Sequence, residues 1–123
     1  WWEEVADPET RKALCRAFHL KLNPADKLYT PETAAAVINR FLLTSSRLCI
    51  FQIQELFALT EKYRSKKPSE ERINVPGTWD DTNWTYRLPL TLETLNTDEL
   101  FSNKVAAMVQ KRRDMFTKPK IYS

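Results

Sequence analysis

Hydrophobic positions recur at helical spacing in three separate stretches of the chain. Each stretch follows a helix-start signal, in which a Thr or Asp supplies a capping oxygen and a Pro or Glu occupies the first turn. Proline suits the first helical position because its missing N–H would have no partner there. The pattern therefore predicts a mostly α-helical chain, with helices over about residues 8–22, 31–43 and 98–116.

One apolar segment, about residues 48–53, has a different pattern. It is almost continuously hydrophobic and contains β-branched and aromatic side chains, which is typical of a strand buried on both faces. A single strand leaves its backbone N–H and C=O groups without partners. Two interpretations stay open: the chain is mostly helical and this segment has another role, or its partner strands lie elsewhere. In the second case, the helix and the strand form the αβ half of a parallel sheet or barrel.

About residues 60–90 show no hydrophobic period, and loops of that length in compact domains are usually functional or disordered. The only glycine of the chain, Gly77, follows Pro76, and such a pair forms a tight turn. The alternative to a binding loop is a packed surface loop with a buried Trp and a salt-bridged Arg. Flat apolar faces and planar polar groups, which a sugar ring requires, surround the turn: Asn74, Trp79, Asp80, Asp81, Asn83, Trp84, Tyr86 and Arg87.

Charge and hydropathy exclude several classes of partner. The 123 residues carry 19 basic and 16 acidic side chains, and a net charge of +3 is too balanced for nucleic-acid binding. The basic run 62–67 precedes two glutamates, Glu70 and Glu71, and indicates a solvated loop. No apolar run approaches the roughly 20 residues that span a membrane.

The remaining chemistry-bearing residues indicate no cofactor and no metal site. Cys15 and Cys49 lack metal-ligand spacing and are expected to be free thiols in a reducing compartment. His19 is the single histidine, so it cannot form a metal site or a triad alone. The chain has no signal-peptide pattern, which favours a cytoplasmic protein. It begins at Trp1 rather than at Met, which suggests a fragment.

Two motifs in the long loop resemble a known family. The loop reads N-x-P-G-T from Asn74 and then N-W-x-x-R-L from Asn83, as in the 4-alpha-glucanotransferases of glycoside hydrolase family 77. Residues 48–59 resemble that family's last barrel strand and the turn after it, and residues 1–4 resemble the stretch after its His-Asp motif. Two departures stand out: Glu55 replaces the usual Asp, and residues 62–72 make the loop longer and more charged.

The resemblance implies that the chain is the C-terminal portion of a (β/α)8 barrel, with the last strand, its long loop and the closing helices. Active sites of such barrels lie at the C-terminal ends of the strands. The parent protein is then expected to transfer α-1,4-glucan segments between maltooligosaccharides by a retaining double displacement. The family's catalytic carboxylates would precede Trp1, so the isolated chain is expected to be inactive and to hold no catalytic residue.

The resemblance also suggests roles within the loop. Asn74 and Gly77 are expected to contact or approach the sugar. The loop would be supported by five residues: Gln54 and Glu55 at the strand end, Pro76 in the turn, Trp84 packed beneath it, and Arg87 paired with a carboxylate.

Other interpretations remain. Maltooligosyltrehalose synthase carries a similar N-x-P-G-T near its end, although the residues Thr85 and Tyr86 argue against it. A non-catalytic glucan-binding or interaction module is the alternative of another class. The expected partners are maltooligosaccharides and the rest of the chain's own barrel, and an isolated fragment with an unpaired strand is expected to self-associate.

Overall fold

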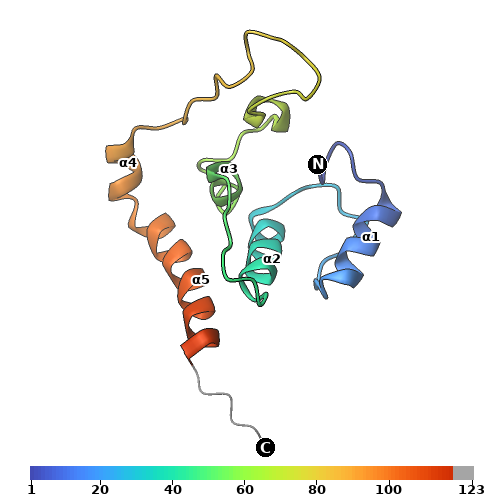
Figure 1. Ribbon diagram of the computed structural model, residues 1–123, viewed down its shortest axis with the longest axis vertical. Helices are drawn as coiled ribbons and strands as arrows, with labels where there is room; N and C mark the ends of the chain where they lie inside the picture. The colour runs from blue at the N-terminus through green and yellow to red at the C-terminus, as the bar shows by residue number, and fades with distance from the viewer. Residues whose placement is uncertain (118–123) are drawn as a thin grey trace, which may run out of the picture.

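The computed structural model describes residues 1–117, and this part of the chain contains helices and loops but no β-strand (Figure 1). The mostly α prediction is confirmed. Within the described residues, no helix combines the length and the apolar composition needed to cross a membrane. The elements are α1 (Pro8–Ala17), α2 (Pro31–Leu42), α3 (Ile53–Phe57), the 3₁₀ helix η1 (Pro68–Glu71), α4 (Leu92–Thr97) and α5 (Glu99–Thr117).

The first two helices begin at the predicted prolines. Asp7 Oδ1 accepts the Thr10 N–H at 2.7 Å at the start of α1, and Thr30 Oγ1 accepts the Thr33 N–H at 3.3 Å at the start of α2. Each bond satisfies one of the backbone donors that a helix leaves open in its first turn. α2 ends at Leu42, one residue before the predicted end.

α1 is shorter than predicted, because it ends at Ala17 rather than near residue 22. His19 adopts a φ of 51°, in the left-handed region. The Leu20 N–H then donates back to the Cys15 C=O at 2.8 Å, which closes a Schellman-type end. A histidine in that conformation gives a weaker sequence signal than the glycine usually found there.

α2 and α5 pack against each other and hold the main core. Their apolar faces enclose a buried cluster that also takes in the residues after α3: Ala34, Ile38, Leu42, Ala58, Leu59 and Met108. Arg112 on α5 donates from Nη1 to the Leu42 C=O at 2.6 Å. This contact gives a partner to a carbonyl at the C-terminal end of α2, where the helix supplies none.

The predicted strand over about residues 48–53 is wrong for the described structure. Residues 48–52 form an irregular connection, and α3 begins at Ile53. Leu48 and Ile50 are 79% and 91% exposed. Residues 1–117 contain no strand, so this segment has no ladder to join. Its side chains alternate instead: Leu48 and Ile50 face solvent, whereas Cys49 and Phe51 pack against the main core.

The last helices differ slightly from the prediction. α5 runs from Glu99 to Thr117, close to the predicted 98–116, but the short helix α4 before it was not predicted. Thr91 caps α4 by accepting the Thr94 N–H at 3.2 Å. In Figure 1 the long loop after η1 crosses the top of the view to reach α4.

Asp98 joins the start of α5 to the segment after α3. Its carboxylate accepts hydrogen bonds from Lys62 Nζ at 2.6 Å and from the Tyr63 hydroxyl, and its Oδ1 accepts the Phe101 N–H at 2.9 Å. These donors, led by Lys62 and Tyr63, hold the pKa of Asp98 well below its usual range. Tyr63 also packs with Phe57 and Phe101, at ring-centroid distances of 5.3 and 5.6 Å.

Acid should therefore destabilise the protein through Asp98. A carboxyl whose pKa is lower in the folded state contributes stability that is present above its unfolded pKa and is lost as pH falls towards its folded pKa. The melting temperature of the wild type should fall below about pH 4. Asp98→Asn should lower the melting temperature at pH 7. The fall in melting temperature from pH 7 to pH 3 should be smaller in this variant than in the wild type.

Asp81→Asn is the matched control, because Asp81 is exposed on the long loop. It should leave both melting temperatures close to those of the wild type. An acid response in Asp98→Asn as steep as that of the wild type would contradict this role for Asp98.

Candidate functional site

The N-terminal segment before α1 is fixed by a buried arginine. Arg11 is only 1% exposed, and its donors reach three backbone carbonyls. Nε donates to Pro24 at 2.8 Å, and Nη1 donates to Ala6 at 2.5 Å and to Trp2 at 3.4 Å. A buried guanidinium needs such acceptors because burial of its charge is costly. Arg11 therefore holds the backbone of residues 2–6 against the connection between α1 and α2.

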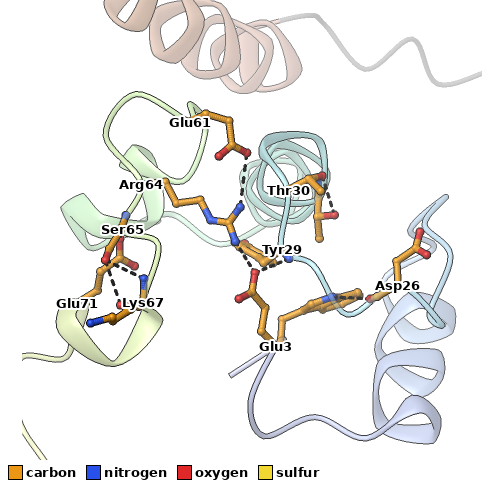
Figure 2. A network of polar contacts seen from close by, with 11 residues as sticks. Glu3, Asp26, Tyr29, Thr30, Glu61, Arg64, Ser65, Lys67 and Glu71 are labelled. Atoms are coloured by element: carbon orange, nitrogen blue, oxygen red, sulfur yellow. Dashed lines mark hydrogen bonds and ion pairs between the residues drawn. The ribbon is translucent and has the colours of Figure 1, made fainter.

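Glu3 connects this segment to the chain after α3. Its Oε1 accepts the Tyr29 N–H at 2.7 Å and forms an ion pair with Arg64 Nη2. Figure 2 shows Arg64 between Glu3 and Glu61, whose Oε1 lies 3.5 Å from Arg64 Nη1. The Arg64 and Glu3 side chains are 17% and 20% exposed, so water screens this pair less than a surface pair.

A second set of contacts fixes the start of the long loop. The Ser65 N–H donates to Glu71 Oε1 at 2.9 Å (Figure 2), and the buried Gln54 donates from Nε2 to the Glu71 C=O at 3.3 Å. Arg72 Nη2 lies 3.4 Å from Glu4 Oε2. η1 is thus tied to α3 on one side and to the N-terminal segment on the other.

These contacts frame a hollow of about 530 Å³. Its volume lies within the roughly 300–1,000 Å³ of small-molecule sites. Aromatic, amide, carboxylate and guanidinium groups all reach its wall: Trp1, Trp2, Glu3, Glu4, Tyr29, Gln52, Gln54, Glu55, Arg64, Glu71, Arg72 and Asn74 line it together with smaller and aliphatic side chains.

Burial alters two titrating groups in the wall of this first hollow. Burial, with a smaller contribution from the Glu55 charge, raises the pKa of Tyr29 to about 12. Burial also raises the pKa of Glu55, against the opposing effect of a hydrogen bond from the Gln52 backbone. Burial thus removes part of the water around these two groups, Tyr29 most of all.

The loop after η1 is braced by its own hydrogen bonds. The Trp84 N–H donates to the Ile73 C=O at 2.6 Å and closes the loop. Inside it, Asn83 Oδ1 accepts the Val75 N–H at 2.8 Å, and Asn83 Nδ2 donates to the Thr78 C=O at 3.3 Å. Residues 73–84 are therefore held in shape by bonds within the loop, while Leu88 and Leu90 further along pack against the cluster of Phe57, Tyr63 and Phe101.

The predicted Pro-Gly turn lies within this loop. The Thr78 N–H donates to the Val75 C=O at 3.2 Å, and Gly77 has a φ of 80°. Proline followed by a residue of positive φ is the pattern of a type II turn. No atom lies within 4 Å of the position that a Cβ on Gly77 would take, so backbone conformation alone favours glycine there.

A second hollow, of about 440 Å³, lies against the braced loop. Asn74 lines both hollows, whereas Gln54 and Glu55 line only the first and Arg87 only the second. Pro76, Gly77 and Trp84 line neither, so the structure does not gather the seven predicted site residues around one hollow. The wall of the second hollow consists of Ser69, Glu70, Arg72, Ile73, Asn74, Val75, Thr82, Asn83, Thr85, Tyr86 and Arg87.

Two predicted supporting contacts are not formed within residues 1–117. Trp84 does not pack beneath the loop: its backbone is in the left-handed region, with a φ of 66°, and the residue is 74% exposed. Arg87 pairs with no carboxylate among residues 1–117, and its Nη1 donates to the adjacent Tyr86 C=O at 3.3 Å. The first prediction required a packed base under the loop and the second required a carboxylate beside Arg87, and residues 1–117 provide neither there.

Sequence reasoning missed Arg64, which lines the first hollow, and Arg11, which fixes the N-terminal segment beside it. Arg64 belongs to the basic run that was interpreted as a solvated loop, yet its side chain is mostly buried against Glu3. Arg11 lies among other charged residues on α1, yet it is almost fully buried. The partners of both lie far away in sequence or on the backbone, so the local pattern of charges carries no signal of burial.

Comparison with known proteins gives one family. A family model described as 4-alpha-glucanotransferase matches residues 1–92, which include both hollows. A 4-alpha-glucanotransferase of Chlamydia pneumoniae is 30% identical over 105 residues, which are 85% of this chain and 19% of that protein. The 4-alpha-glucanotransferase DPE2 of Oryza sativa subsp. japonica is 32% identical over 103 residues, 80% of this chain and 10% of that protein.

A third relative has a similar identity and coverage. A 4-alpha-glucanotransferase of Chlamydia muridarum is 26% identical over 108 residues, which are 88% of this chain and 20% of that protein. The chain thus spans about a tenth to a fifth of the length of these curated relatives. No solved structure gives a significant match.

The Glu3–Arg64 pair should stabilise the first hollow measurably. A double-mutant cycle with Glu3→Gln and Arg64→Met should give a coupling free energy of about 1–3 kcal/mol, the scale of a charged hydrogen bond shielded from water. Urea unfolding of the wild type, the two single variants and the double variant measures it.

The control cycle uses Lys67 and Glu70, whose charged groups lie 3.5 Å apart on side chains that are 75% and 60% exposed. Their coupling should stay below about 0.5 kcal/mol. Equal coupling in the two cycles would show that Glu3 and Arg64 form an ordinary surface pair.

Proposed function

Because the chain belongs to the 4-alpha-glucanotransferase family, we propose that it forms part of an enzyme that transfers α-1,4-glucan segments between maltooligosaccharides. The family match over residues 1–92 is the observation that carries this proposal. The mixture of aromatic faces and planar polar groups around the two hollows supports it, because sugar rings bind to such surfaces.

The proposed reaction is a retaining double displacement. A carboxylate attacks the anomeric carbon, and a carboxylic acid gives its proton to the departing glycosidic oxygen. The 4-hydroxyl of an acceptor then attacks the glycosyl-enzyme intermediate and loses its proton to the same acid/base group. We assign both carboxylates to a part of the enzyme outside this chain, and we assign to this chain the binding and orientation of the glucan.

We further propose that the chain is the C-terminal portion of a (β/α)8 barrel in the whole enzyme. Residues 48–53 would then join the barrel sheet as its last strand and lose the exposure that Leu48 and Ile50 have here. The rest of the barrel is the proposed partner, and the cytoplasm is the proposed location. An isolated chain would keep an unpaired apolar segment, and we expect it to self-associate through that segment.

Within this site we assign Asn74 to a donor-side sugar contact. It is exposed, and it lies where the two hollows meet. Pro76 and Gly77 shape the turn that carries it. Gln54 supports the start of the loop through its bond to the Glu71 C=O, and Glu55 adds a polar group to the wall of the first hollow.

The isolated chain should show no disproportionating activity, because it would lack the catalytic carboxylates. Incubation with maltotriose and measurement of released glucose tests this expectation. Glucose release above that of a buffer blank would contradict the assignment of the catalytic carboxylates to another part of the enzyme. If the full-length protein binds maltooligosaccharides but shows no turnover, the non-catalytic module is favoured instead.

The isolated chain is also expected to self-associate. Sedimentation velocity on the isolated chain tests this expectation, and a single monomeric species would refute it.

In the intact enzyme, Asn74→Ala should weaken the transition state without unfolding the protein. The loss of hydrogen bonds to the sugar costs about 1–3 kcal/mol, which lowers kcat/KM on maltotriose about 5- to 150-fold. Asn103→Ala on the exposed face of α5 is the control and should keep wild-type kinetics. Wild-type kinetics in Asn74→Ala would remove the sugar contact.

Gly77→Val should lower kcat/KM at least as much as Asn74→Ala, by distortion of the loop. A β-branched residue is strained at a φ of 80°, although the space around it is open. Kinetics on maltotriose and a thermal melt of the same variant measure the effect. A lower melting temperature with unchanged kinetics would mean that the turn serves stability alone.

A further inference from the structure

Three consecutive residues separate the two hollows and belong to both. Arg72, Ile73 and Asn74 line the 530 Å³ hollow against α3 and also the 440 Å³ hollow against the braced loop. The hollows are therefore neighbours that share one narrow wall. A ligand longer than one hollow could pass across Asn74 from the first to the second.

The second hollow is rich in groups that bind hydroxyls. Arg72 and Arg87 bring guanidinium donors, Asn83 brings an amide, and Glu70 brings a carboxylate. The Asn83 amide is already engaged in bracing the loop, as described above. Arg87 is exposed, and among residues 1–117 its only hydrogen bond is the one from Nη1 to the neighbouring backbone, which leaves most of its five donors for a ligand.

Tyr86 adds a flat aromatic face to the same wall. It is half-buried, and burial, together with the nearby Glu71 charge, raises the pKa of its hydroxyl. The ring is thus partly withdrawn from water before any ligand arrives. Because the loop is braced by its own hydrogen bonds, a ligand would lose little affinity to loop ordering.

An α-1,4-glucan presents the same sugar unit repeatedly, so neighbouring hollows can bind successive parts of one chain. Building on the proposed transfer activity, we propose that the second hollow is an additional glucan subsite that selects for longer chains. Arg87 is its hydroxyl-binding residue and Tyr86 its stacking face. Asn74 contacts the sugar at the boundary and therefore serves short and long glucans alike.

The test compares two substrates in the intact enzyme, purified as its gene encodes it. The ratio of kcat/KM on maltoheptaose to kcat/KM on maltotriose reports use of the second hollow. For the wild type this ratio should be well above one. Arg87→Met keeps the apolar stem but removes the donors, and it should lower the ratio on the order of tenfold. Asn74→Ala should lower kcat/KM on both substrates and leave their ratio nearly constant.

A pair of variants isolates the stacking face. Tyr86→Phe keeps the aromatic ring and should keep the ratio, whereas Tyr86→Leu removes the ring and should lower it several-fold. Arg113→Met on the exposed end of α5 is the matched control for Arg87→Met and should keep the wild-type ratio. Circular dichroism melts confirm that each variant is folded.

The outcomes separate this inference from the function on which it rests. If the wild type transfers no glucan at all, the proposed function fails. A second outcome is that the wild type transfers glucan, but Arg87→Met and Tyr86→Leu keep the wild-type ratio of the two kcat/KM values or lower both values equally. The proposed transfer activity then stands, and the additional subsite is refuted.

Discussion

The Glu3 carboxylate is the point at which three parts of the chain meet. Glu3 Oε1 accepts a hydrogen bond from the Tyr29 N–H and forms an ion pair with the Arg64 guanidinium. The N-terminal segment, the connection before α2 and the chain after α3 are therefore joined at one carboxylate oxygen. Arg11 fixes the same N-terminal segment from the other side through backbone carbonyls. These contacts join the segments that supply Glu3, Tyr29 and Arg64 to the wall of the first hollow.

The braced loop depends on that anchor only indirectly. η1 is attached through Gln54 and Arg72, and beyond it the loop is stabilised by its own turns. The loop can therefore present Asn74 between two hollows while its far side, with Trp79 and Trp84, stays in solvent. A site built in this way combines a fixed wall from the helices with a wall that is rigid on its own.

The sequence predicted the features that local chemistry decides. The capped prolines marked the starts of α1 and α2, and the Pro-Gly pair marked the type II turn. It failed where the outcome depends on distant groups. The apolar run 48–53 reads as a strand, yet a strand forms only if another strand lies beside it, and the described chain has none. For the same reason the burial of Arg11 and Arg64 left no local signal.

The way the loop is braced bears on the order in which the site assembles. The bonds between Ile73 and Trp84, and between Val75 and Asn83, join residues that are close along the chain. Closing such a short segment costs little chain entropy. The contact between Glu3 and Arg64 joins residues 61 positions apart, and it forms only after much of the intervening chain has collapsed. We therefore expect the loop to take shape as a local unit before the Glu3–Arg64 contact completes the hollow beside it.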